Sequence, residues 1–147
     1  MILSVSPFGA LLAGALFFII ILLLIVLTLN ILYLLSLQNA LKKVSSQNRT
    51  VEPGNVWLML IPIFSIIYSF ILYPKISESL KNEFESRNMP QSGDYGKLVG
   101  FLLAIFGVVG VIANLIIPFL ATFVGLALLV LWIVYWVQIA GFKSKLD

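Results

Sequence analysis

Residues 98–142, LVGFLLAIFGVVGVIANLIIPFLATFVGLALLVLWIVYWVQIAGF, contain no charged residue. A helix that crosses the hydrocarbon core of a bilayer needs about 20 apolar residues. This tract is too long for one such helix and long enough for two. Asn114 and Pro118 supply turn chemistry near its middle. We therefore expect spans over residues 98–115 and 119–141, joined by a short turn.

Two other tracts, residues 1–41 and 53–74, are also free of charge. Each can supply one membrane helix, which we place at residues 8–37 and 56–74. All charged residues fall in the three remaining segments, 42–52, 75–97 and 143–147. The sequence thus predicts an all-α integral membrane four-helix bundle that forms a single transmembrane domain over residues 1–147.

The overall composition agrees with this class and excludes several others. The chain is 61% hydrophobic and 10% charged, whereas soluble domains are about 45–50% apolar and about 25% charged. Cys and His are absent, which removes thiolate and imidazole metal sites and Cys or His catalysis. No carboxylate lies in the expected spans, although ion-coupled transporters generally need one. We expect no enzyme, no catalytic or metal-binding residue, no cofactor and no nucleic-acid partner; the lipid bilayer is the first partner.

Residues 75–88 follow a helical pattern after the second expected span. Ile76, Leu80 and Phe84 recur on one face, and charged side chains occupy the other. Glu83 and Arg87 form an i, i+4 pair that contributes about 0.2–0.5 kcal/mol at most. The segment is typical of an amphipathic helix on the membrane surface or against neighbouring helices. Its three carboxylates are expected to be solvated surface charges: Glu78, Glu83 and Glu85.

The distribution of Lys and Arg predicts the orientation. Four spans would place six of them on one side: Lys75, Lys81, Arg87, Lys97, Lys143 and Lys145. The other side would hold three: Lys42, Lys43 and Arg49. Cytoplasmic loops carry the excess of Lys and Arg, so we expect both termini in the cytoplasm. A re-entrant segment at residues 56–74 would change this count.

Small residues recur at helical spacing in the third span. They let helix backbones approach closely within a membrane. The stripe could pack inside the chain's own bundle, which we favour, or form a homo-oligomer interface. The predicted helix-packing residues are Gly96, Gly100, Ala104, Gly107, Ala121 and Gly125.

Polar and aromatic side chains suggest two further sets of residues. Beside Pro62, three side chains mark the place where a pore or ligand pocket would lie: Ser65, Tyr68 and Ser69. Aromatic rings prefer the headgroup level of a bilayer. Five of them near the ends of the second and fourth spans are expected to be interface anchors: Trp57, Tyr73, Trp132, Tyr135 and Trp136.

The sequences NRTVEPGNVWL (residues 48–58), IPIF (61–64) and ISESLKNEF (76–84) form a recognisable pattern together with residues 132–143. In its Pro-Gly-x-Val-Trp and Ile-Pro-x-Phe elements, this pattern resembles a family of uncharacterised small bacterial four-span membrane proteins. The resemblance implies membrane topology and bacterial origin, and it assigns no site.

Together these features predict a non-enzymatic multi-pass inner-membrane protein that acts as a structural or interaction subunit, packing with itself or with a membrane-protein partner. The alternative is a small homo-oligomeric channel built around the serines of the second span. A third, less favoured hypothesis is an accessory subunit of a lipid-handling enzyme whose chemistry resides in another chain.

Overall fold

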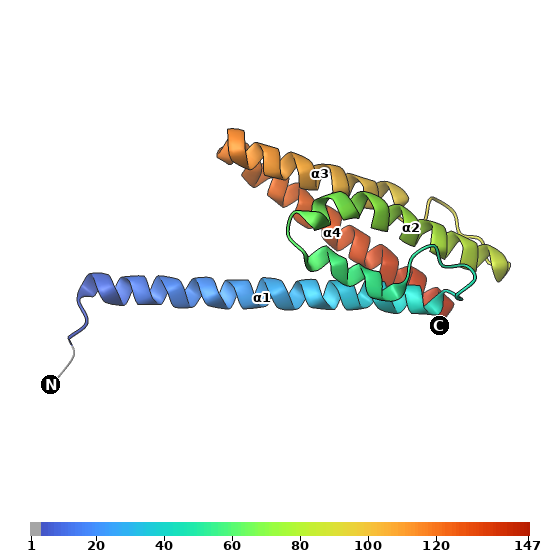
Figure 1. Ribbon diagram of the computed structural model, residues 1–147, viewed down its shortest axis with the longest axis horizontal. Helices are drawn as coiled ribbons and strands as arrows, with labels where there is room; N and C mark the ends of the chain where they lie inside the picture. Colours follow the sequence, from blue (N-terminus) through green and yellow to red (C-terminus); the bar gives the residue numbers. More distant parts are fainter. Residues whose placement is uncertain (1–3) are drawn as a thin grey trace. The chain divides into compact units, whose positions relative to one another are not determined.

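The computed structural model describes residues 4–147, and within that range the regular structure is entirely helical (Figure 1). The elements in chain order are α1 (Pro7–Lys43), the 3₁₀ helix η1 (Pro53–Leu60), α2 (Phe64–Ser86), α3 (Lys97–Ile116) and α4 (Pro118–Leu146). The chain divides into two compact units, one ending at Tyr33 and the other covering Leu34–Asp147. The expected all-helical class is confirmed.

The first unit contains most of α1. Ser6 begins the helix, because its Oγ accepts a hydrogen bond from the N–H of Gly9 at 3.0 Å and Pro7 follows at the first helical position. Farther along, the Thr28 hydroxyl and the Asn30 amide donate to backbone carbonyls one turn earlier, at 2.7 and 2.8 Å. These local bonds satisfy polar groups on an exposed and mostly apolar helix surface. Residues 4–28 have exposed side chains except at Gly9.

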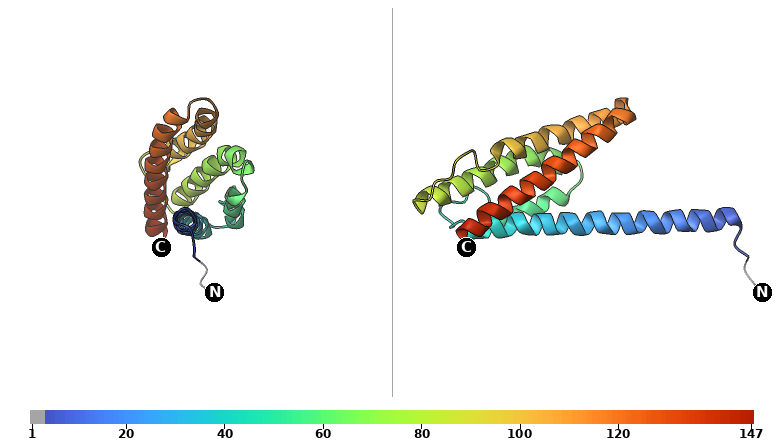
Figure 2. Two further views of the ribbon diagram at one scale, coloured as in Figure 1. Left: turned by 90° about the vertical axis from the view of Figure 1, so that its left-hand side faces the viewer. Right: turned by 180° about the vertical axis from the view of Figure 1, so that it is seen from behind.

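In the second unit, α3 and α4 form an antiparallel hairpin, and α2 packs against α3 (Figures 1 and 2). The turn lies at Ile117, whose N–H still donates to Ala113 at 2.8 Å, and Pro118 starts the next helix. Pro at this first position lacks an N–H that would have no partner in any case. The expected hairpin of residues 98–115 and 119–141 is therefore present, extended by a few residues.

Among the described residues 4–147, three helices are long and apolar enough to cross a membrane: α1, α3 and α4. The prediction of four is wrong because residues 56–74 do not form one helix. The 3₁₀ helix ends at Leu60, Pro62 has no N–H, and Ile63 adopts φ 66°, a conformation that β-branched residues rarely take.

Helix α2 then begins at Phe64 and runs through Pro74 into the charged segment. Its first ten residues are uncharged and mostly apolar, and the remainder is amphipathic. Ile76, Leu80 and Phe84, the predicted apolar face, are fully buried. The amphipathic segment is thus the second half of a longer helix, and its apolar face packs inside the protein.

The core of the second unit depends on a close approach between α3 and its neighbours. A Cβ atom on Gly100 would lie 2.7 Å from the Cβ of Tyr73 and 3.3 Å from the ring of Tyr135. Real Cβ atoms do not come that near another carbon, so only glycine fits here. The Tyr73 and Tyr135 rings meet edge to face with centroids 4.8 Å apart, an arrangement that aromatic pairs favour.

Candidate functional site

The C-terminal end of α1 is closed by Arg49 from the following loop. Its Nε donates to the carbonyls of Leu41 at 3.1 Å and Val44 at 2.8 Å. The last carbonyls of a helix have no partner within it, and a cation there also interacts favourably with the helix dipole. Arg49 therefore fixes the loop against the end of α1.

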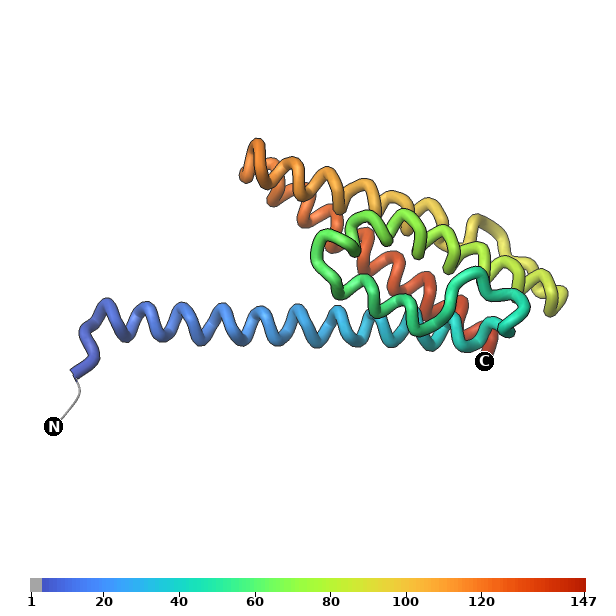
Figure 3. The backbone as a smooth tube through the Cα atoms, in the orientation of Figure 1, coloured from blue at the N-terminus to red at the C-terminus, as the bar shows by residue number. Residues whose placement is uncertain are grey.

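The loop that follows α1 runs beside the C-terminal half of α2 (Figure 3). Glu83 of α2 accepts hydrogen bonds from this loop. Only 4% of the residue is exposed. Its Oε2 accepts hydrogen bonds from the backbone N–H of Ser45 at 2.9 Å, from the Ser45 hydroxyl at 2.8 Å and from the Asn48 amide at 2.7 Å. The expectation of a solvated surface charge is wrong for Glu83, because the loop covers it; Glu78 and Glu85 are exposed as predicted.

The surroundings of Glu83 decide its protonation. Burial by itself would raise the pKa of Glu83, but hydrogen bonds from Asn48, Ser45 and Arg87 outweigh burial and lower the pKa to about 2. Each of these donors favours the ionised carboxylate. Glu83 is consequently an anion throughout the physiological pH range.

Arg87 extends this network to two more helix ends. Its Nε lies 3.0 Å from Glu83 Oε1, the predicted i, i+4 pair. Its two terminal nitrogens donate to the carbonyl of Leu146 at 2.8 Å and to that of Lys43 at 3.3 Å. One guanidinium thus links the C-terminal ends of α1, α2 and α4, as its five donors allow.

Two exposed contacts add to this link. Lys43 Nζ lies 2.8 Å from Asp147 Oδ1, and Lys145 Nζ donates to Gln91 Oε1 at 2.8 Å. The hydrogen bond from Lys43 lowers the pKa of Asp147. Exposed pairs of this kind contribute about 1 kcal/mol or less, so they mark proximity more than stability. We call residues 41–50, 83–97 and 143–147 the charged end.

The charged end is incompatible with the four-span order. Four spans would put residues 42–55 on one face of the bilayer and residues 75–97 and 143–147 on the other. Direct contacts join these segments, from Ser45 to Glu83 and from Lys43 to Asp147. The expected separation of the loops is therefore wrong.

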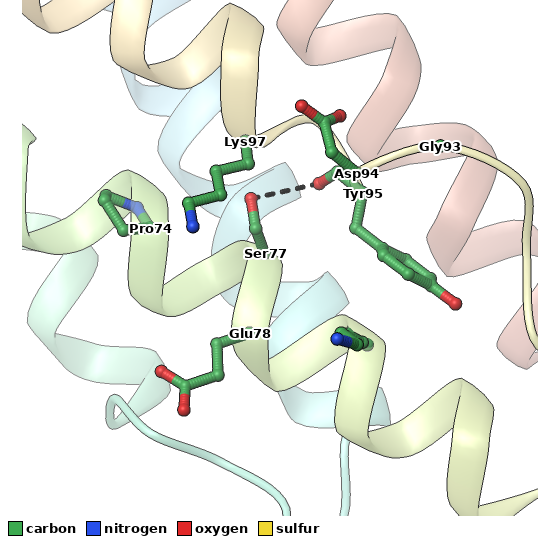
Figure 4. A pocket seen from close by; sticks show the side chains of 8 residues that line it. Pro74, Ser77, Glu78, Gly93, Asp94, Tyr95 and Lys97 are labelled. Atoms are coloured by element: carbon green, nitrogen blue, oxygen red, sulfur yellow. Dashed lines mark hydrogen bonds between the residues drawn. The ribbon is translucent and has the colours of Figure 1, made fainter.

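An open groove lies beside the charged end, between α2 and the segment that leads into α3 (Figure 4). Its volume is about 460 Å³. The Ser77 hydroxyl donates to the Tyr95 carbonyl at 3.1 Å across its floor. The groove is lined by Pro74, Ser77, Glu78, Lys81, Gly93, Asp94, Tyr95 and Lys97. It carries two cations and two carboxylates. No sequence pattern signals this combination, because its members come from two separate segments.

A second, apolar cavity of about 310 Å³ adjoins this groove. It shares Pro74, Asp94 and Lys97 with the groove and adds Leu98 and Phe101 from the first turns of α3. Because three lining residues are common, the two cavities lie next to each other. The polar groove therefore borders an apolar part of α3, a helix that is long enough to span a membrane.

The residues predicted for a pore do not line either of these two cavities. The Ser69 hydroxyl donates to the Ile66 carbonyl of its own helix at 2.8 Å. Tyr68 is buried and stacks on Phe64 with centroids 5.4 Å apart. Ser65 is half-buried on the same helix. Ser69 uses its hydroxyl proton locally, as serines in helices commonly do.

The predicted packing residues fall into two groups. Gly96, Gly100 and Ala104 are buried, and a Cβ on Gly96 would lie 3.3 Å from the Gln138 side chain. By contrast, apart from the adjoining backbone of the same helix, no atom of the described part of the chain lies within 4 Å of the Cβ position of Gly107 or Gly125. Ala121 is half-buried. The small residues at the start and in the first half of α3, from Gly96 to Ala104, face the chain's own helices, whereas Gly107 and Gly125 leave open space.

The aromatic residues predicted to be interface anchors lie in different environments. Tyr73 and Tyr135 were expected at the headgroup level, but both are buried in the core. Trp132 and Trp136 are half-buried and pack edge to face at 5.1 Å. Trp57 Nε1 donates to Gln38 Oε1 at 3.2 Å.

Within residues 4–147 no group of three or more His, Cys, Asp or Glu side chains could hold a metal ion. Comparison of the chain with protein families, curated proteins and solved structures gives no match in any of the three. The resemblance to small bacterial four-span proteins therefore stays a prediction.

Proposed function

We propose that the protein is a three-span integral membrane protein, with α1, α3 and α4 as the spans, and that it acts as a non-enzymatic structural or interaction subunit. At about 1.5 Å per residue, the 37 residues of α1, the 20 of α3 and the 29 of α4 reach about 55, 30 and 44 Å. Each length is sufficient for a hydrocarbon core of about 30 Å.

The observation that carries this proposal is the contact between Lys43 and Asp147. With three spans, the ends of α1 and α4 share one face of the bilayer, as this contact requires. All nine Lys and Arg residues then lie on that face, compared with six against three for four spans. By the positive-inside rule the charged end is cytoplasmic, and the Ser4 end of α1 is on the opposite face. In a bacterium the membrane would be the inner one.

Residues 53–73 then enter the bilayer from the charged side and return to it. The apolar part of α2, residues 64–73, reaches about 15 Å, half of the hydrocarbon core. The turn at its tip suits this depth: Pro62 has no N–H, and the N–H groups of Phe64 and Ser65 donate to Pro62 and Ile61 at 2.7 and 2.9 Å. Satisfied backbone groups are what lipid requires.

Open small residues support the interaction role. Gly107 and Gly125 leave room beside α3 and α4, and small residues at a helix surface permit close association in lipid. The partner would be a second copy of this chain or another membrane helix.

Cysteine labelling tests the topology, because the natural chain has no Cys. Ser4→Cys, Ser46→Cys and Ser92→Cys place single thiols at exposed positions. We expect an impermeant maleimide to label Ser46→Cys and Ser92→Cys from the same side and Ser4→Cys from the other. Labelling of Ser46→Cys and Ser92→Cys from opposite sides would refute the three-span arrangement.

Association is tested with a matched pair of glycines on α3. Gly107→Leu should lower the oligomeric mass in nanodiscs and leave the monomer folded, whereas Gly100→Leu should unfold the monomer through its contact with Tyr73. A protein that is monomeric at every concentration, or that associates equally well with Gly107→Leu, would contradict the proposed interface.

A further inference from the structure

We infer that the groove beside the charged end and its apolar continuation hold one phospholipid with a zwitterionic, amine-bearing headgroup of the phosphatidylethanolamine type. This inference rests on the proposed three-span topology, which puts the groove at the cytoplasmic boundary of the bilayer. The lining changes from polar to apolar at the three residues that the two cavities share, Pro74, Asp94 and Lys97.

Lys97 lies where the lining of the groove changes from charged to apolar residues. It is the first residue of α3 and the last charged residue before the charge-free tract, and Leu98 and Phe101 follow within about one helical turn. Lys75 is likewise the first charge after the apolar part of α2. Both helices thus change from polar to apolar at the same groove, which matches the change from headgroup to acyl chain.

The charges in the groove are complementary to a zwitterion. Figure 4 shows the Lys97 side chain extending toward Pro74 and Ser77, while Glu78 projects from the next turn of α2. Within residues 4–147 no ion pair holds Lys97 or Glu78, and Lys81 has only a 4.0 Å contact with Glu85. Two ammonium groups are therefore available to a phosphate, and one carboxylate to an amine.

Asp94 has a different role, although it also lines the groove. Its Oδ1 accepts from the N–H of Gly96 at 3.2 Å and its Oδ2 from the N–H of Leu98 at 2.8 Å. It caps the start of α3, and in Figure 4 its carboxylate points away from Lys97. Glu78 is consequently the group that would receive the lipid amine.

The apolar continuation accounts for an acyl chain. Leu98 and Phe101 are exposed, and the Phe101 ring meets Phe70 of α2 edge to face with centroids 6.2 Å apart. A hydrocarbon chain lying along this surface would cover side chains that the protein leaves bare. A soluble phosphate compound would make no use of it.

The test is lipid retention. The protein is purified from vesicles that contain equal amounts of phosphatidylethanolamine, phosphatidylcholine and phosphatidylglycerol, and the retained lipids are quantified by mass spectrometry. We expect phosphatidylethanolamine to be enriched about two- to threefold over the other two, the size that one exposed charge contact supplies. Equal retention of the three lipids, or enrichment of phosphatidylglycerol, would overturn the inference.

Three variants separate the contributions. Glu78→Gln should abolish the preference for phosphatidylethanolamine over phosphatidylcholine, because only the primary amine donates to the carboxylate. Lys97→Gln should lower retention of both lipids. Lys75→Gln, an exposed cation on α2 outside the groove, should change neither. If Lys75→Gln has the same effect as Lys97→Gln, the groove is not the binding site.

Soluble phosphoethanolamine distinguishes a lipid from its free headgroup. It should fail to displace the retained lipid at millimolar concentration; displacement would refute the acyl-chain contact. The cysteine labelling described above reports on topology alone. Correct topology without lipid preference would therefore refute this inference and leave the proposed function intact.

Discussion

Replacing Glu83 by Gln tests whether the charged end holds the second unit together. The carboxylate accepts four hydrogen bonds, and all four come from donors on Ser45, Asn48 and Arg87. A Gln side chain has the same shape but must turn an NH₂ group toward some of these donors. It also leaves the Arg87 guanidinium without its anion.

The size of the effect follows from the pKa of Glu83. Its lowering from 4.5 to about 2 corresponds to roughly 3 kcal/mol of preferential stabilisation of the anion. The network lies next to water, and solvent screening reduces this to about 1–2 kcal/mol. For a chain of this size we expect Glu83→Gln to lower the melting temperature by about 3–6 °C. Tryptophan fluorescence during heating in detergent measures it.

The pH dependence of stability independently checks that ionised Glu83 stabilises the folded protein. The pKa of Glu83 is lower in the folded than in the unfolded protein, so the stabilisation is complete above about pH 4.5 and is lost as the pH falls toward 2. The difference between wild type and Glu83→Gln should shrink over that interval.

Glu85→Gln is the matched control on the same helix. Glu85 is about half exposed and meets Lys81 only at 4.0 Å, so this change should alter the melting temperature by about 1 °C or less. The reasoning would be refuted if Glu83→Gln were no more destabilising than Glu85→Gln at pH 7, or if its effect persisted unchanged at pH 2.

Two further predictions concern packing and capping. Gly100→Ala should destabilise the second unit by about 1–3 kcal/mol, because the added methyl overlaps Tyr73. Gly107→Ala has open space and should be neutral or slightly stabilising. Equal melting temperatures of the two variants would contradict the close approach of Gly100 to Tyr73. Arg49→Met should expose the last carbonyls of α1 and destabilise the end of this helix by about 1 kcal/mol. The measurement is hydrogen exchange, which should become faster at residues 41–44. Unchanged exchange would show that Arg49 is not the cap.

Much of the fold was predictable from charge placement. The charge-free tract of residues 98–142 specified the hairpin of α3 and α4, and the periodicity of Ile76, Leu80 and Phe84 identified a buried face. Residues 56–74 misled the prediction because their composition suits a span. Composition does not reveal the backbone conformation of Ile63, whose φ of 66° separates the end of η1 from the start of α2.

The candidate site was harder to predict than the fold. Glu83 and Arg87 were recognised as a helical pair, but their partners Ser45 and Leu146 are distant in sequence. An isolated charged residue on an amphipathic helix is normally solvated, so only the folded loop reveals that Glu83 is buried. Arg49 could have been suspected as a C-cap, since it closely follows Lys42 and Lys43 at the end of a long helix.

The sequence by itself determined the all-helical class and predicted a membrane protein, because long apolar runs and a scarcity of charge leave few other solutions. It also confined the charges to three short segments. Only the tertiary structure decided that these segments meet at one end, because hydrogen bonds from Ser45 to Glu83 and from Arg87 to Leu146 depend on which helix ends pack together. Charged groups that touch must share one aqueous face, so this contact argues against four spans and supports the three-span topology proposed above.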